Sequence, residues 1–282
     1  MTRALGDATL TMVNGGDFRL DGGAMHGVVP KTLWSRLVSC DEQNRCTYST
    51  NCLLVEIGGK RVLVETGNGD KFPPRLKELY GIDHDRSVAV ALAELGVEPE
   101  SIDAVVLTHL HFDHVGGATR RRGDTALPTF PRARHVVQKA ELDAALHPHE
   151  RNRASYLAEN IEPLRAAGLF DIVDGEAEVV PGVRVLPTPG HSRGHQSVLI
   201  DGGNGEKAIF LGDVVPTSIH VPYPWVMGYD LDVEGTLASK KRLYARALEE
   251  KWLLLYGHDR RHASTLTLDS RGQPVAGALV DL

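Results

Sequence analysis

Three histidines and an aspartate are crowded into the stretch LTHLHFDHVGG, which directly follows the apolar run IDAVVL. With 13 histidines in 282 residues, such a string would arise by chance about 0.002 times. His109 and His111 lie two positions apart, so on an extended backbone they point the same way and can bind one metal ion. Asp113 and His114, further round the loop, face a second ion. These ligands suit zinc and its first-row neighbours. The stretch therefore predicts a metal site rather than a hydrogen-bonded surface loop.

Three further stretches place a metal-capable residue after an apolar run and a glycine. They are VLPTPGH, AIFLGD and LLLYGH, which end in His191, Asp213 and His258. Each pattern alone is weak evidence, because a single histidine is more often a hydrogen-bonded structural residue than a ligand. The glycine before each side chain lets the backbone pass close to a bound ion. With the first stretch, the five histidines and two aspartates are enough ligands for two adjacent metal ions.

The overall composition is that of an ordinary globular protein, with 42% hydrophobic and 24% charged residues. The net charge of -6, without a long run of Lys and Arg, argues against a nucleic-acid partner. No apolar run approaches the roughly eighteen residues of a membrane span, and the start of the chain resembles a strand rather than a signal sequence. Three cysteines without a C-x-x-C pair indicate reduced thiols in a cytoplasmic protein; a Cys40–Cys46 disulfide is the alternative.

Strand and helix patterns are mixed along the whole chain, without a low-complexity linker. Residues 51–67 contain two apolar runs around Gly-Gly, which is a hairpin pattern, and residues 85–96 repeat apolar positions at helical spacing. Residues 138–168 are predicted to form two or three helices, and residues 232–252 one amphipathic helix. Short strands are predicted before each metal-capable side chain. We therefore expect a single domain, residues 1–282, in which two sheets pack together with helices outside.

The order THLHFDHVGG, PGHSRGH, LGD and YGHD resembles that of the metallo-β-lactamase-fold hydrolase superfamily. This resemblance covers nearly the whole chain and implies an α/β protein, a four-layer αβ/βα sandwich with a dinuclear site at one edge. It also implies two divalent metal ions, with zinc favoured over iron, manganese or cobalt. Carried over residue by residue, it implies a first metal held by His109, His111 and His191, a second held by Asp113, His114 and His258, and Asp213 bridging both. Metallo-β-lactamases proper commonly carry a cysteine near the second metal, so Asp213 favours the hydrolase branches with a bridging aspartate.

A finer likeness lies outside the ligands. Residues 21–34, the hairpin and the histidine stretch resemble the branch of quorum-quenching lactonases, which open N-acyl-homoserine lactones. Glu65 stands where that family more often has aspartate, and we expect it to form hydrogen bonds behind the ligands. Family members place a tyrosine shortly after the bridging aspartate, but this chain has Val-Val-Pro there. Tyr223 or His220 is therefore predicted to assist catalysis from further along the loop.

The chemistry that these residues predict is hydrolysis of a lactone or ester. Metal binding lowers the pKa of water to about 7, so a hydroxide bridging the two ions can attack a carbonyl that one of them polarises. Asp213 or Asp113 is predicted to pass the proton to the leaving alkoxide. No side-chain nucleophile is needed, and we interpret Ser192 as part of the turn around the predicted ligand His191 rather than as a nucleophile.

Apolar and aromatic residues in two Gly- and Pro-broken segments flank the predicted site. Both segments are predicted to be loops that bind an acyl chain. The substrate-binding residues predicted from them are Met25, His26, Val28, Trp34, Ile219, Tyr223, Trp225 and Met227. Alternatively, they cover a sheet edge or contact a second subunit in a homodimer. The expected partner is a small-molecule lactone or ester, and neither nucleic acid nor membrane is expected.

Other hydrolases would use the same ligands, and an arylesterase, a phosphotriesterase and a thioester hydrolase stay open as alternatives. The thioester hydrolase is disfavoured because the chain lacks an evident basic C-terminal region for a glutathione carboxylate. A redox di-iron protein is disfavoured because 282 residues leave no room for an added flavin domain. A non-catalytic binding module is disfavoured because all seven ligands are present.

Overall fold

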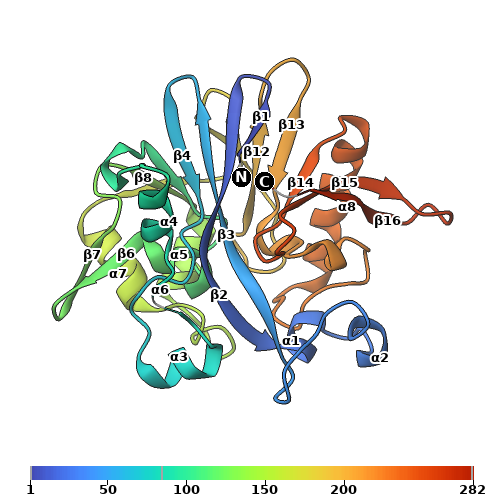
Figure 1. The fold of residues 1–282 in the computed structure, drawn as a ribbon, viewed down its shortest axis with the longest axis horizontal. Coiled ribbons are helices and arrows are strands. Elements are labelled where there is room, and N and C mark those ends of the chain that lie inside the picture. The colour runs from blue at the N-terminus through green and yellow to red at the C-terminus, as the bar shows by residue number, and fades with distance from the viewer. Residues whose placement is uncertain (1, 84, 281) are drawn as a thin grey trace.

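Two seven-stranded β-sheets form the centre of the protein, as a computed structural model of the chain shows (Figure 1). The structure describes residues 2–83, 85–280 and 282. In spatial order, the first sheet consists of β1 (Thr2–Leu5), β2 (Ala8–Asp21), β3 (Arg45–Ile57), β4 (Lys60–Val64), β5 (Ala104–Val106), β8 (Arg134–Gln138) and β9 (Phe170–Val173). The second consists of β10 (Ala177–Val180), β11 (Val183–Pro187), β12 (Gln196–Asp201), β13 (Lys207–Phe210), β14 (Leu253–Leu255), β15 (Ala263–Leu268) and β16 (Pro274–Val280). A separate ribbon pairs β6 (Thr119–Arg122) with β7 (Thr125–Pro128).

The larger helices cover the outer faces of the sheets (Figure 1). The first sheet is covered by α4 (Val88–Glu94), α6 (Lys139–Leu146) and α7 (Ala158–Ala166), and the second by α8 (Val233–Glu249). Shorter helices lie in the connections, namely α1 (Gly22–His26), α2 (Lys31–Trp34), α3 (Pro74–Tyr80) and α5 (Phe112–Val115).

Strand β3 shows how the sequence specifies these layers. Leu53 and Val55 are buried in the core between the two sheets, where they join Phe210 of β13. Leu54, between them in sequence, is buried instead in the core that contains Leu92 of α4. Successive side chains of a strand point to opposite faces, so one strand contributes to two cores. The predicted four-layer αβ/βα sandwich is confirmed, and so is the hairpin of β3 and β4 around Gly58 and Gly59.

Parallel pairing brings several strand ends to one edge. In the first sheet β4, β5, β8 and β9 are parallel neighbours, and in the second β13 is parallel to β14. Chains leaving the carboxyl ends of parallel strands emerge on the same side, which is where open α/β sheets place their sites. The segments after β5, β13 and β14 carry six of the seven side chains that the sequence singled out, and the seventh, His191, follows β11.

Residues 22–34, the first of the two segments that were predicted to be loops, contain two short helices. The Asp21 side chain accepts a hydrogen bond from the Ala24 backbone at 2.9 Å and so caps the first turn of α1. Trp34, at the end of α2, is buried. The loop prediction was wrong here because a helix of one turn is too short to show an apolar repeat.

The cysteines also differ from the prediction. Cys40 and Cys46 are joined by a disulfide, while Cys52 is free and buried. The prediction of reduced thiols is therefore wrong for the pair, and the cytoplasmic location inferred from it loses that support, because disulfides are rare in the cytosol. Within the described ranges, no helix is both long and apolar enough to cross a membrane.

Candidate metal centre

Seven buried side chains from both sheets converge at the edge where the strands end. The first sheet supplies four of them from the turn after β5 and from α5, namely His109, His111, Asp113 and His114. The second sheet supplies three from the turns that follow β11, β13 and β14, namely His191, Asp213 and His258. The structure thus brings together every residue that the sequence predicted as a ligand.

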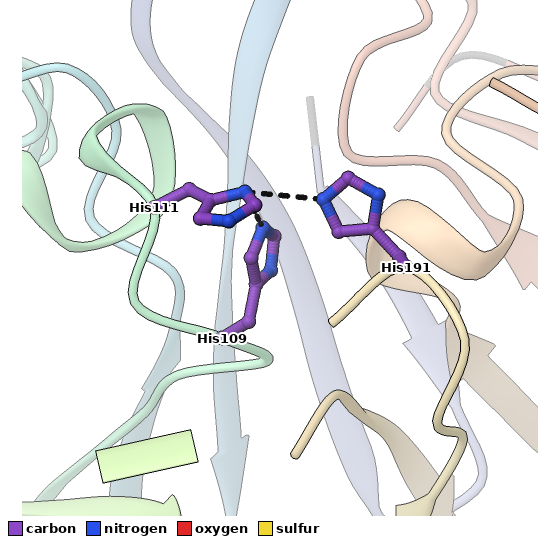
Figure 2. A group of neighbouring side chains, drawn as sticks. All are labelled: His109, His111 and His191. Carbon is purple, nitrogen blue, oxygen red and sulfur yellow. Dashed lines mark hydrogen bonds between the residues drawn. The ribbon is translucent and has the colours of Figure 1, made fainter. Parts of the chain in front are cut away.

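Three imidazoles form a first group, and Figure 2 shows their rings pointing toward one another. His109 Nε2 lies 3.0 Å from His111 Nδ1, and His191 Nε2 lies 3.1 Å from that same nitrogen. Two of these residues lie two positions apart, and the third comes from the other sheet. Three nitrogens this close together can bind one metal ion.

A second group combines two imidazoles with a carboxylate. His258 Nε2 lies 3.2 Å from His114 Nε2. Asp113 Oδ2 lies 3.5 Å from each of these two nitrogens. This group also draws on both sheets and can hold a second ion.

Asp213 lies between the two groups. Its Oδ2 is 3.3 Å from His191 Nε2 of the first group. Its Oδ1 is 3.1 Å from His258 Nε2 and 3.5 Å from His114 Nε2 of the second group. One carboxylate therefore directs a different oxygen at each group, which is the geometry that a bridging ligand needs.

In His191 and His258, the Nδ1 atom faces away from the ligand groups and has a hydrogen-bond acceptor, which leaves Nε2 free to bind a metal ion. His258 Nδ1 is 2.8 Å from the Ser49 carbonyl oxygen, and His191 Nδ1 is 3.0 Å from Asp230 Oδ1. Because an N–H must donate to each of these acceptors, the Nε2 of a neutral ring keeps its lone pair for a metal. His114 Nδ1 lies 3.3 Å from Glu65 Oε2, a contact without hydrogen-bond geometry. The Nε2 atoms of His114 and His258 lie 3.2 Å apart, so they need a cation between them or a proton on one of them.

The carboxylates make this place attract positive charge. Burial opposes ionisation of Asp213, but His258, His114 and His191 outweigh it and hold the pKa of its carboxyl well below its usual value. For the His114 imidazole, burial also disfavours the charged form and so lowers the pKa. Asp113, Asp213 and Glu65 outweigh burial and raise the pKa of His114 well above its ordinary value. A proton on that ring is what a metal ion would displace.

A cavity of about 280 Å³ opens onto these side chains, which is close to the lower limit for small-molecule sites, about 300 Å³. Five of the metal-facing residues line it, namely His111, Asp113, His191, Asp213 and His258. The apolar lining comes from Leu20, Met25, Phe112, Met227 and Leu231, and polar groups come from Tyr80, Arg151, Asn152, Ser155 and Tyr229.

Comparison with known proteins decides the family. A sequence model of the metallo-beta-lactamase superfamily matches residues 47–258. The chain belongs to this superfamily. An N-acyl homoserine lactonase of Bacillus cereus is 32% identical over 222 residues, which cover 74% of this chain and 80% of that one.

Two solved structures share the fold over most of their length. A probable metal-dependent hydrolase from Staphylococcus aureus aligns with a TM-score of 0.90 at 29% identity, covering 99% of both chains. An N-acyl homoserine lactone hydrolase with the product N-hexanoyl-L-homoserine at its catalytic metal centre aligns with a TM-score of 0.68 at 27% identity, covering 92% of this chain and 95% of that one. The protein is thus a metal-dependent hydrolase of the metallo-β-lactamase superfamily.

The two residues that were predicted to assist catalysis lie outside the cavity of this superfamily member. His220 is buried, with Nε2 2.8 Å from the Met25 carbonyl oxygen and Nδ1 2.7 Å from Thr217 Oγ1. The Tyr223 ring packs against Tyr244 of α8, with the ring centroids 5.6 Å apart. Internal contacts thus occupy both side chains, and neither lies in the cavity lining where the predicted role would place it.

The predicted substrate-binding residues divide in the same way. Met25 and Met227 line the cavity, whereas the other six do not. His26 stacks between Trp34 and His220, with ring centroids 4.9 and 5.1 Å away, so these rings form a buried stack. Val28 is 86% exposed. The remaining three, outside the cavity lining, are Ile219, Tyr223 and Trp225.

Two buried carboxylates behind the ligands were missed by the sequence reasoning. One is Asp230, whose contact with His191 spans 39 positions. The other is Glu141 of α6, which accepts hydrogen bonds from Leu110 N at 2.9 Å and Ser192 Oγ at 2.6 Å. Glu141 therefore ties the turn after β5 to the turn after β11. Neither residue shows a local pattern that would reveal it, whereas Glu65 was expected behind the ligands and accepts a bond from Thr108 N at 2.8 Å.

Proposed function

We propose that the protein is a dinuclear-metal lactonase that opens N-acyl-homoserine lactones or related lactones and esters with an apolar tail. The observation that carries this proposal is Asp213, which directs one carboxylate oxygen at each metal-facing group. The similarity of the chain to N-acyl homoserine lactonases supports lactones as the substrate class.

Two divalent ions fit these donor groups. The first would be held by His109, His111 and His191 and the second by Asp113, His114 and His258, with Asp213 shared between them. When bound, the ions would activate a water molecule and polarise the ester carbonyl. Nitrogen and carboxylate donors of this kind favour zinc, and iron, manganese and cobalt are compatible with them.

The net reaction adds water across the acyl–oxygen bond of the ring. The acyl carbon gains a hydroxyl group, the bond to the ring oxygen breaks, and that oxygen must receive a proton. Asp113 lines the cavity. Burial opposes its ionisation, but His114 and His258 outweigh it and lower the pKa of its carboxyl. An ionised Asp113 can take the proton from water at a carboxylate oxygen and return it to the leaving alkoxide. Asp213 is less suited to this step, because both of its oxygens face imidazole nitrogens.

The cavity walls suit an acyl tail. Met25 comes from α1, and Met227 and Leu231 come from the segment before α8; they supply apolar surface beside the metal-facing groups. Each buried methylene should improve transition-state binding by about 0.8 kcal/mol. The value of kcat/KM should therefore rise about fourfold per methylene and then level off when the cavity of about 280 Å³ is full.

A substrate panel tests the proposal. The protein is stripped with a chelator and reloaded with zinc, its metal content is measured by elemental analysis, and turnover is followed on lactones of increasing acyl length. Aryl esters, phosphotriesters and glutathione thioesters serve as rival substrates. We expect about two metal ions per chain and the highest kcat/KM on an acylated lactone. A profile that is flat across acyl length, with phosphotriesters or thioesters turned over faster than every lactone, would sink the lactonase assignment.

A further inference from the structure

One arginine joins the two halves of the molecule at the wall of the cavity. Arg151 lies in the connection between α6 and α7, which cover the first sheet, and its hydrogen-bond partners precede α8, which covers the second (Figure 1). Its Nη2 donates to the Gly228 carbonyl at 2.6 Å and to the Asp230 carbonyl at 3.3 Å. Both Arg151 and Gly228 line the cavity, so this contact forms part of the cavity wall.

Arg151 lies on the solvent side of this cavity. Arg151 and Tyr229, which follows Gly228, are both exposed. The metal-facing residues that line the same cavity are buried, and His191, for example, is only 1% exposed. The difference in exposure separates a rim from a floor, and the hydrogen bonds of Arg151 cross the rim. The charge of the guanidinium strengthens them, since hydrogen bonds from an ionised donor are roughly twice as strong as neutral ones.

The wall segment that this arginine holds consists of residues 227–231. The cavity residues that it supplies are Met227, Gly228, Tyr229 and Leu231. Two backbone hydrogen bonds anchor it elsewhere, because Gly228 N donates to the Ala24 carbonyl at 2.8 Å and Leu231 N to the His191 carbonyl at 3.2 Å. These bonds tie the wall segment to α1 and to a metal-facing turn. Loss of the arginine would therefore free the side that faces the α6–α7 connection and keep the attachment to the metal centre.

We propose that Arg151 sets the length of the acyl tail that the cavity accepts, by holding the wall segment in place across the rim. The inference rests on the proposed function and deepens it, because it names the residue that limits the tail. The cavity of about 280 Å³ is small for a ligand site. A tail that exceeds this space must displace the wall segment, and the displacement breaks the charge-assisted hydrogen bonds of Arg151.

Substrates that differ only in the tail test this assignment. Hexanoyl- and dodecanoyl-homoserine lactone carry a short and a long tail, and γ-butyrolactone, which has no tail, reports on ring opening alone. The values of kcat and KM are measured for each with the zinc-loaded enzyme. The readout is the tail ratio, which is kcat/KM for the dodecanoyl lactone divided by kcat/KM for the hexanoyl lactone. A partial loss of folded or metal-loaded enzyme lowers both values equally and leaves the tail ratio unchanged.

Matched variants locate the effect. Arg151→Met keeps most of the side chain and removes every donor, so the tail ratio should rise at least about fourfold, the gain for one more buried methylene. The rise should come mainly from a lower KM for the long lactone, and kcat on γ-butyrolactone should stay unchanged. Arg151→Lys keeps the charge and should restore part of the wild-type ratio.

A neighbouring arginine provides the control. Arg153 lies in the same connection and contacts Glu150 at 3.6 Å, but it does not line the cavity. Arg153→Met removes the same charge from the same connection and should keep the wild-type tail ratio. Arg151→Gln, which is shorter and uncharged, should give the same rise as Arg151→Met and serves in its place if that variant does not fold.

The outcomes are distinguishable. A tail ratio that rises in Arg151→Met and keeps its wild-type value in Arg153→Met supports the inference. A ratio that Arg151→Met leaves unchanged, or that rises equally in Arg153→Met, overturns the role of Arg151 while the lactonase proposal stands. If the zinc-loaded wild type opens no lactone but hydrolyses a rival ester, the proposed function fails and this inference fails with it.

Discussion

The metal centre and the cavity wall beside it are built on different principles. At the centre, the outer nitrogens of His191 and His258 face fixed acceptors, a buried carboxylate and a backbone carbonyl, so each ring is oriented before any metal binds. On the wall, Arg151 joins two segments that are 77 positions apart. A preorganised centre suits one reaction, whereas the wall depends on contacts between segments far apart in the sequence. The chemistry and the choice of substrate should therefore be separable by mutation.

The largest effect is expected at the side chain that both metal-facing groups share. Asp213→Ala should remove one oxygen donor from each group, so metal content and rate should fall together. We expect kcat/KM to fall by about a thousandfold or more, since metal ions contribute several kcal/mol to such reactions. Elemental analysis and steady-state kinetics measure the two quantities. Asp143→Ala, at an exposed position on α6, is the control. An Asp213→Ala protein with two metals and full turnover would end the bridging assignment.

A smaller loss, of metal affinity, is expected when Asp230, the hydrogen-bond partner of His191, is removed. Asp230→Ala leaves all seven metal-facing side chains in place but frees His191 Nδ1, which now lies 3.0 Å from Asp230 Oδ1. Metal affinity should fall by about 10–100-fold, and the loss should affect one of the two ions more than the other. Competition with a chelator measures both affinities. An equal loss of affinity for both ions, or no loss for either, would contradict the division into two groups.

The same contrast explains which residues could be predicted. The seven metal-facing residues could be found because each follows an apolar strand within a short local pattern, and the fold then brings the strand ends together. Asp230 and Glu141 could not, because their contacts with the ligand turns join segments far apart in the sequence. Arg151 and Asn152 lie in a polar turn between helices that resembles any surface connection.

His220 and Tyr223, which follow Asp213, lie away from the cavity for a specific reason. Distance along the chain from Asp213 does not show which way a side chain points, and the segment around Val221 and Tyr223 packs against α8. Lys240 of that helix is buried, and its Nζ donates to the backbone carbonyls of His220, Pro222 and Trp225 at 2.6, 3.2 and 2.7 Å. A buried lysine that binds three carbonyls leaves no local pattern in the segment it binds.

A third prediction tests whether the centre depends on the contact between its two turns. Glu141 accepts four hydrogen bonds, from Leu110 N, Tyr156 Oη, Ser192 Oγ and Gly194 N. Glu141→Gln turns one acceptor oxygen into a donor that faces other donors. We expect the free energy of unfolding to fall by about 1–3 kcal/mol, measured by urea denaturation. Tyr156→Phe removes a single donor and should cost less. A Glu141→Gln protein as stable as the wild type would show that the two turns are held by other contacts.

The smallest effect, a change in the pH dependence of stability, is expected at His26, which does not line the cavity. This ring is buried in the stack with Trp34 and His220, and burial lowers its pKa from 6.5 to about 4. The folded protein therefore keeps His26 neutral at a pH where the unfolded chain binds a proton. Stability is lost as the pH falls from 6.5 toward 4, and at pH 5 the loss should be about 2 kcal/mol.

The variant His26→Phe separates packing from substrate choice. Its phenyl ring can occupy the stack and cannot take up a proton, so the free energy of unfolding should fall by about 2 kcal/mol less than in the wild type between pH 7.5 and pH 5. Urea denaturation at the two pH values measures this difference, and His147→Phe, at an exposed histidine of the same chain, is the control. Because His26 does not line the cavity, the preference for acyl length should stay unchanged. If His26→Phe instead shifted the preference toward longer acyl chains, the stack of His26, Trp34 and His220 would have to be counted among the residues that select the substrate.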